Sequence, residues 1–341
     1  MDQNRAAFMR GNFGLMTHWL YVPVDTDPPQ GSLEEQTAEW NRRVDEFDVE
    51  LLASQLADIK AKWFILTLGQ GSGFYCAPNP VYDAIIGRPI SKCSKRDLFR
   101  DLAKELKKRD IRAIAYLPGS PPGYDKEAAG ILQWTNPVLK DEKGEILRNS
   151  HGFRSYTPTR NAEFLEKWQR VIACWAQSWA DLCGGWWIDG IYYVKGMFDT
   201  ADEPNFKSFA AALRAGNPDA AISFNPGILR IDSPYIVSDV EDYSAGEMNS
   251  YLFTPFGRNM IPDDLANGRI GHAQLQLLGF LGGNWGQGPA PRYPDELLAG
   301  WTRYILNNGG GVTWDVPTNR KGDIWENFLP ALKNLGKAIY G

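Results

Sequence analysis

Two stretches of the sequence place carboxylates next to apolar runs, and the first of these runs ends in Asp189. Asp189 follows Trp186, Trp187 and Ile188 and precedes Gly190. A structural aspartate at such a point commonly caps a following helix or pairs with a basic neighbour. The stretch IYYVKGMF that comes next does not read as a helix start, which favours a catalytic role for Asp189.

The segment DVEDYSAGEMN supplies the second set of carboxylates, on Asp239, Glu241, Asp242 and Glu247. Most clusters of this kind are solvated surface, and the residue types alone do not choose among the four. Retaining glycoside hydrolysis needs two carboxyl groups about 5–5.5 Å apart, one that attacks the anomeric carbon and one that protonates the leaving oxygen. Carboxylates at two strand ends of one barrel can meet that spacing.

The sequence lacks the motifs that phosphate binding, serine hydrolysis and metal binding would need. The glycine-rich run at 69–73 has no lysine of a phosphate-binding loop, and the sequence has no GxSxG elbow. The four cysteines are scattered without a CxxC pair and there are three histidines, so we expect neither a metal nor another cofactor. A net charge of −5 argues against nucleic acids and anionic membranes as partners. It also disfavours strongly sulfated substrates, unless a local basic pocket exists.

Short apolar runs alternate with amphipathic stretches along the chain, which is typical of a parallel sheet buried on both faces. The expected strands are 13–19, 62–68, 111–117, 186–190, 221–225, 235–240, 279–285 and 310–316. The expected helices are 48–60, 97–109, 161–182, 204–214, 294–307 and 323–338. Eight strands with intervening helices predict an α/β fold, a TIM-like (β/α)8 barrel that forms a single catalytic domain over residues 1–341.

The strand-to-helix links are much longer than the helix-to-strand links, and in such a barrel they share the face that carries the active site. The 13 Trp, 14 Tyr and 16 Phe could simply fill a large core, yet many stand beside glycine and proline in these links, where flat rings suit a sugar face. A histidine at a strand end could equally be a core residue. The residues expected to bind the carbohydrate are His18, Trp19, Gln70, Asn225, Trp285, Trp187 and Tyr192.

The opening MDQNRAAFMRGNFG has no signal-peptide pattern, and no apolar run approaches the roughly 20 residues that cross a bilayer. The sequence as given therefore predicts a cytoplasmic protein, although an export signal could have been removed from it. The oligomeric state stays open, with a homo-oligomer as one alternative.

Six motifs in order resemble those of the α-L-fucosidase family of glycoside hydrolases, over nearly the whole chain. FGLMTHW resembles the family's opening strand FG(I/L)(F/M)xHWG, and WIDG at 187–190 resembles its nucleophile strand WFDG. Residues 47–74 and 95–116 resemble its second and third strands, and GGGVTWDVP resembles GGNLLLNVGP. DYSAGE at 242–247 is similar to DFxTPE, whose glutamate is the acid/base in part of the family. The resemblance implies a retaining barrel enzyme with Asp189 as nucleophile and Glu247 as acid/base, or Glu241 or Asp242 in its place.

The sequence departs from this family where the family holds fucose. Gln70 and Gly71 stand where the family has paired histidines, and Asn225-Pro226-Gly227 lacks the arginine of NDRWG. A site built for particular hydroxyl groups rejects their analogues strongly, so these changes imply a different sugar. We expect a single barrel domain without the β-sandwich that usually follows the barrel in this family. We therefore expect a glycosidase that removes a terminal sugar other than fucose, with a transglycosidase at the same site and a carbohydrate-binding pseudoenzyme as alternatives.

Overall fold

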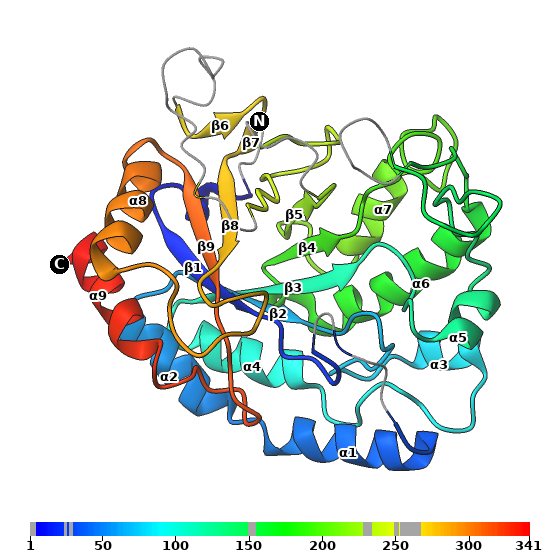
Figure 1. Cartoon of the computed structure of the whole chain (residues 1–341), viewed down its shortest axis with the longest axis horizontal. Coiled ribbons are helices and arrows are strands. Elements are labelled where there is room, and N and C mark those ends of the chain that lie inside the picture. The colour runs from blue at the N-terminus through cyan, green and yellow to red at the C-terminus, as the bar shows by residue number, and fades with distance from the viewer. Residues whose placement is uncertain are drawn as a thin grey trace.

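The computed structural model describes residues 5–23, 26, 30–148, 155–227, 234–248, 252 and 267–341. Within this part of the chain, seven parallel strands form one sheet in the order β5-β4-β3-β2-β1-β9-β8 (Figure 1). They are β1 (Phe13–Thr17), β2 (Trp63–Thr67), β3 (Arg112–Pro118), β4 (Gly185–Asp189), β5 (Ala221–Phe224), β8 (Gln276–Phe280) and β9 (Gly311–Asp315). A separate antiparallel pair consists of β6 (Arg269–Ile270) and β7 (Ala273–Gln274).

The sheet curls, and an extended segment at residues 242–248 connects its two edges. Parallel bridges join Tyr243 to Gln274 and Glu247 to Leu278 on the β8 side. On the other side, the backbone N–H of Asp242 donates to the carbonyl oxygen of Ile222 in β5 over 2.8 Å. The regular sheet therefore has seven strands where eight were predicted, in a TIM-like α/β domain whose remaining gap holds this irregular segment.

The predicted strand at 235–240 is wrong, because backbone N–H groups of this stretch donate to a side chain and not to a neighbouring strand. Val237 and Ser238 donate their N–H groups to the Glu241 carboxylate over 2.7 and 2.8 Å, which bends the chain around that residue. The strand β8 also starts earlier than predicted. It begins at the polar Gln276, which is fully buried and whose amide nitrogen donates to the hydroxyl of Thr313 over 2.7 Å.

Helices cover the outer side of the curled sheet (Figure 1). Asp48 and Asp97 start two of them as N-caps, since their side chains accept the N–H groups of Leu51 and Arg100. The helices are α1 (Leu33–Glu46), α2 (Val49–Ile59), α3 (Pro80–Ile86), α4 (Leu98–Lys107), α5 (Lys126–Ile131), α6 (Ala162–Trp179), α7 (Phe206–Leu213), α8 (Asp295–Asn307) and α9 (Leu329–Tyr340). The helices α1, α3 and α5 lie within the long links, and short 3-10 turns occur at Ala7–Met9 and Ala180–Leu182.

Two helix boundaries differ from the prediction. The helix expected at 161–182 ends at Trp179 and continues only as a 3-10 turn. The helix expected from 323 starts at Leu329, because Thr318 and Ile324 first form an antiparallel bridge. Pro330 then fits the first turn of α9, where its missing N–H costs no helical hydrogen bond.

Alternate side chains of the strands pack into two separate cores, as the period of two requires. The inner core lies within the curl and includes Met16, Ile65, Ile114, Tyr116, Trp187 and Leu278. The outer core lies between the sheet and the helices and includes Leu15, Phe64, Leu66, Ala115, Trp186 and Ile188. This alternation decides which strand-end residues face the mouth of the curl.

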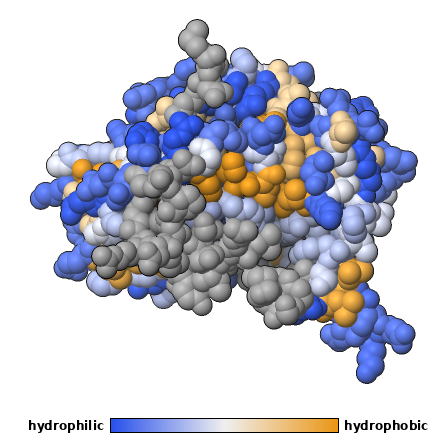
Figure 2. All heavy atoms as spheres, turned by 90° about the horizontal axis from the view of Figure 1, so that it is seen from above, coloured by the Kyte–Doolittle hydropathy of each residue, from blue (hydrophilic) through white to orange (hydrophobic). Residues whose placement is uncertain are grey.

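Among the coloured residues of the face drawn in Figure 2, most are hydrophilic, and a short band of hydrophobic residues lies near the middle of the face. Among the helices of the described ranges, none combines the length and the apolar character needed to cross a membrane.

Candidate active site

The carboxylate of Asp189 lies at the carboxyl end of β4 and accepts three hydrogen bonds. Its Oδ2 accepts from the Tyr116 hydroxyl over 2.5 Å. Its Oδ1 accepts from the backbone N–H of Gly190 and from Nδ2 of Asn225, each over 2.8 Å. The three donors fix both oxygens of the carboxylate, so its position follows from β3, β4 and the end of β5.

The carboxylate of Glu247 lies beside that of Asp189, and a single amide group joins them. Asn225 Nδ2 donates to Glu247 Oε2 over 2.6 Å and to Asp189 Oδ1 over 2.8 Å. These two distances add up to 5.4 Å, so the two carboxylate oxygens cannot lie farther apart than that. Asn225 Oδ1 accepts the N–H of Gly227 over 3.1 Å, which agrees with this orientation of the amide.

Burial raises the pKa of Glu247 to about 7, and the negative charge of Asp189 acts in the same direction. The hydrogen bond from Asn225 and the charge of His18 lower this pKa by smaller amounts. Near neutral pH, Glu247 can therefore both donate and accept a proton.

Tyr192 lies near enough to the two carboxylates for their charges to act on its hydroxyl group. The charge of Asp189 is the largest cause that raises the pKa of Tyr192, followed by burial and by the charge of Glu247. The ring fits against Gly227, where an added Cβ would lie 2.7 Å from Cε1 of the tyrosine. Tyr192 thus lies at the candidate site, and its role in binding carbohydrate stays a prediction.

Sequence reasoning gave Tyr116 no role of its own, and the structure places it at the centre of the site. Its hydroxyl accepts from Gln70 Nε2 over 2.7 Å and donates to Asp189, so Gln70 acts on Asp189 through Tyr116. Its ring stacks on Trp187 with centroids 5.3 Å apart. The available signal was the spacing of two residues from Ile114, which places both side chains on the inner side of β3.

His18 faces the same mouth from the end of β1. Its Nδ1 lies 2.8 Å from Oδ1 of the fully buried Asp315, whose other oxygen accepts the N–H of Gly286. The ring of Trp285 lies 5.4 Å from the His18 ring, centroid to centroid. The Asp315 contact fixes one ring nitrogen of His18 and leaves Nε2 for another partner.

Two of the tryptophans predicted to bind carbohydrate are buried: Trp19 lies in the outer core, and Trp187 lies beneath Tyr116. Trp19 packs in the outer core against Trp40 and Phe47, and its indole N–H donates to the carbonyl oxygen of Arg320 over 3.2 Å. The structure therefore does not bring Trp19 to the carboxylates. Trp187 lies on the inner side but is 3% exposed, so it forms the floor beneath Tyr116.

The alternative acids of the 239–247 segment have other partners. Glu241 is buried, and its carboxylate accepts the N–H groups of Phe224, Val237 and Ser238. Asp242 forms an ion pair with Arg214 over 2.6 Å at the other end of the segment. Asp239 is exposed. Of the four candidate acids, Glu247 is the one that shares the Asn225 amide group with Asp189.

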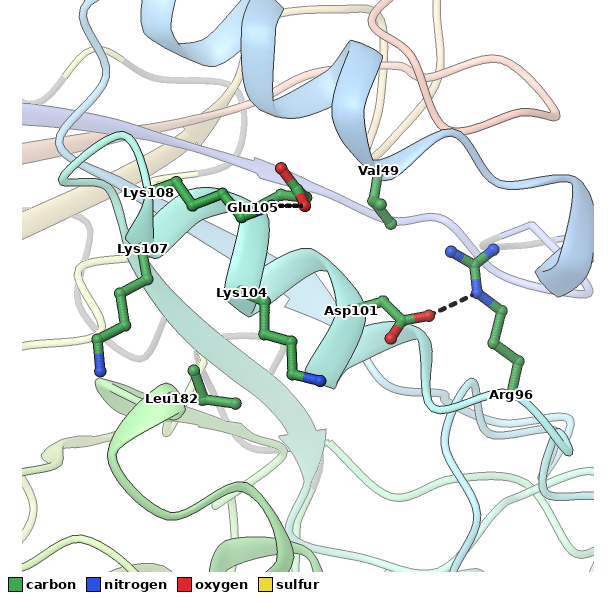
Figure 3. A pocket seen from close by; sticks show the side chains of 8 residues that line it. All are labelled: Val49, Arg96, Asp101, Lys104, Glu105, Lys107, Lys108 and Leu182. Atoms are coloured by element: carbon green, nitrogen blue, oxygen red, sulfur yellow. Dashed lines mark hydrogen bonds and ion pairs between the residues drawn. The ribbon is translucent and has the colours of Figure 1, made fainter.

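A cavity of about 490 Å³ on the outside of α4 is separate from this site (Figure 3). Its lining includes Arg96, Lys104 and Lys108 and none of the predicted site residues. Asp101 and Glu105, which also line it, form ion pairs with Arg96 and Lys108.

Solved structures to which this chain is similar include several glycoside hydrolases. An endo-fucoidan hydrolase of glycoside hydrolase family 107 matches with a TM-score of 0.69 and 20% identity over 98% of this chain and 64% of its own. Another endo-fucoidan hydrolase of that family matches with a TM-score of 0.68 and 14% identity over 99% and 94%. An α-L-fucosidase from Lactobacillus casei in complex with α-L-fucose matches with a TM-score of 0.58 and 14% identity over 98% of both chains.

The chain spans 53% to 64% of the length of three endo-fucoidan hydrolases of glycoside hydrolase family 107, the first one above among them. No protein-family model matches the sequence, and no curated protein matches it. The structural matches confirm the α-L-fucosidase-like glycoside hydrolase fold that the motifs predicted.

Proposed function

We propose that this chain is a retaining glycoside hydrolase in which Asp189 is the nucleophile and Glu247 the acid/base. The observation that carries this proposal is the Asn225 amide, which holds the two carboxylate oxygens within 5.4 Å of each other. Retaining enzymes have carboxyl groups about 5–5.5 Å apart, and inverting enzymes need roughly 6.5–9.5 Å to admit a water molecule. The limit on Asp189 Oδ1 and Glu247 Oε2 concerns one oxygen of each acid, and its size favours the retaining arrangement.

The surroundings of the two acids favour this division of roles. Asp189 accepts three hydrogen bonds, which suits an ionised carboxylate that attacks the anomeric carbon. Glu247 has a pKa of about 7 and can hold the proton that the leaving oxygen requires. After the leaving group departs, the ionised Glu247 takes a proton from water, and that water cleaves the bond between the sugar and Asp189.

The two acids are distinguished by mutation and by the leaving group. Asp189→Asn should abolish turnover of every glycoside, because each route passes through the covalent adduct on Asp189. Glu247→Ala should still form this adduct from an activated aryl glycoside, whose leaving group needs no proton. It should then stall, and added azide or formate should restore turnover by replacing the missing base.

Mass spectrometry of the stalled protein and product stereochemistry provide the readouts. Azide rescue of Asp189→Ala with inverted product, and none for Glu247→Ala, would exchange the two roles. A transglycosidase would transfer the sugar from its adduct to an added sugar in preference to water. Wild-type protein that binds sugars and turns over no glycoside would identify a pseudoenzyme.

The sugar is to be found with a panel of aryl glycosides of both anomers, including pentoses, together with fucoidan. Its first members are fucosides, because structural neighbours are described as fucoidan hydrolases and α-L-fucosidases. Gln70, Gly71 and Pro226 stand where the fucosidase motifs have other groups, so we expect slow or absent turnover of an aryl α-L-fucoside compared with another glycoside. A kcat/KM of about 10⁴ M⁻¹s⁻¹ or more for that fucoside would contradict this expectation.

A further inference from the structure

One aromatic ring near the mouth of the curl is half exposed although both loops around it are well anchored. Tyr124 is 50% exposed and lies on the link that follows β3. Its backbone N–H donates to the carbonyl oxygen of Gly71 over 2.8 Å, on the link that follows β2. An added Cβ at Gly71 would lie 3.3 Å from ring atom Cε2, so the ring packs closely over this glycine.

The residue next to this tyrosine fixes the loop. Asp125 is 5% exposed, forms ion pairs with Arg88 and Lys92, and caps α5 by accepting the N–H of Ala128. Burial alone would raise the pKa of Asp125, but the Arg88 guanidinium and the Lys92 ammonium group lower it to about 2. Asp125 is therefore ionised near neutral pH, and both ion pairs persist there. The exposed ring therefore sits on a preorganised base, which limits the entropy lost when a ligand binds.

Hydrogen bonds join both loops to the surroundings of the nucleophile. The N–H of Gly119, where the Tyr124 link begins, donates to the backbone carbonyl oxygen of Asp189 over 2.7 Å. Gln70 precedes Gly71 and contacts Tyr116, which holds the Asp189 carboxylate. Hydrogen bonds thus connect both loops beside the Tyr124 ring to the residues that position Asp189.

The topology places this ring across the mouth from Glu247. Glu247 belongs to the segment that connects β8 to β5, and Gly71 follows β2. In the order β5-β4-β3-β2-β1-β9-β8, β2 is the middle strand and so lies farthest from that segment in both directions. The acid/base role proposed for Glu247 puts the leaving group beside that residue, so the opposite side of the mouth is the one for sugar units that stay on the enzyme.

We propose that Tyr124 is a stacking subsite for a second pyranose unit, attached to the reacting sugar on the side away from the leaving group. This inference rests on the proposed function and names its substrate class: a glycan with at least two sugar units before the cleaved bond. The flat ring would cover the apolar face of the second unit. An enzyme that removes only a single terminal sugar would have no second unit for Tyr124 to contact. One experiment therefore tests both the subsite and the number of sugar units before the cleaved bond.

The test compares a monosaccharide with a disaccharide, both as 4-nitrophenyl glycosides of the sugar that the panel selects, with α-L-fucose first. Tyr124→Ala should lower kcat/KM on the disaccharide about tenfold and leave the monosaccharide within about twofold. Tyr124→Phe keeps the ring and should match the wild type on both. Leu51→Ala is the control, because it removes a 43% exposed apolar side chain from α2 on the outer surface.

Equal losses on both glycosides, or no loss on the disaccharide, would overturn the subsite. A wild-type protein that turns over no member of the panel would overturn the proposed function instead. The subsite is then tested by calorimetric titration of Asp189→Asn with oligosaccharides of one to four units, fucan first and then those of the other sugars in the panel, and the series that binds is used. A gain in affinity from the second unit that Tyr124→Ala removes would support it, and equal affinities would reject it.

Discussion

At the scale of single residues, the neutral side chain of Asn225 positions both carboxylates of the candidate site. Its amide has two hydrogens, and each is directed to a different carboxylate. The amide thereby offsets part of the repulsion between Asp189 and Glu247 without adding a charge of its own. A lysine or arginine there would pair with both acids and favour ionised Glu247, which could not donate a proton.

Tyr116→Phe tests the hydroxyl that holds Asp189. The substitution keeps the ring stacked on Trp187 and removes the 2.5 Å hydrogen bond to Oδ2. Hydrogen bonds to charged groups contribute about 1.5–3 kcal/mol, so kcat/KM should fall by roughly 10- to 100-fold. The thermal midpoint serves as a control for folding. An unchanged kcat/KM would show that Gly190 and Asn225 position Asp189 without help.

The pH profile tests the protonation of Glu247. Its pKa of about 7 lies above the ordinary value for glutamate, and the acid role requires the protonated form. For a glycoside with a poor leaving group, kcat/KM should therefore be highest below about pH 7 and fall as the pH rises. Glu247→Ala, assayed on an activated aryl glycoside, should lose this alkaline limb. A limb that persists in this variant would belong to another group.

At the scale of elements, Glu241 organises a loop where the sequence predicts a strand. Its carboxylate is buried and accepts three backbone N–H groups, and burial raises its pKa to about 8. Glu241→Ala leaves these donors without their acceptor, so the free energy of unfolding should fall by about 3 kcal/mol or more in urea titrations. The matched control is the neighbouring exposed Asp239, where Asp239→Ala should change it by less than about 0.5 kcal/mol. Equal effects of the two variants would mean that Glu241 is an ordinary surface acid.

The elements that sequence predicts well are those whose signal is local. Continuous apolar runs identify β2 and β3, and Asp48 and Asp97 mark where α2 and α4 begin. The segment 242–248 has no such signal, because its small and polar residues are held by hydrogen bonds to distant parts of the chain.

The candidate site could be predicted only in part, for the same reason. Strand ends identify Asp189 and His18, yet the inner and outer faces of a buried strand are both apolar, so the sequence does not say which face a residue takes. His18 and Trp19 follow β1 directly and continue its alternation, so His18 lies at the mouth and Trp19 in the outer core. Tyr116 stays unrecognised for the same reason, although it lies on the inner side of β3.

At the scale of the whole molecule, closure of the curl and the pairing of the two acids depend on the same segment. Gly246 has a φ of +63°, and an added Cβ there would lie 1.9 Å from the carbonyl oxygen of Gln276 in β8. Gly246→Ala must therefore push the segment away from β8, and Glu247 moves with it. We expect the free energy of unfolding to fall by about 3 kcal/mol or more, and kcat/KM to fall at temperatures where the protein is still folded.

Gly300 in α8 is the matched control, because nothing lies within 4 Å of an added Cβ and its φ is that of a helix. Gly300→Ala should raise the free energy of unfolding by about 0.5–1 kcal/mol and leave kcat/KM unchanged. Urea titration and assays on the same aryl glycoside measure both quantities for the two variants. If Gly246→Ala lost stability but kept full activity, the position of Glu247 would not depend on closure of the curl, and its contact with Asn225 alone would be enough to hold it beside Asp189.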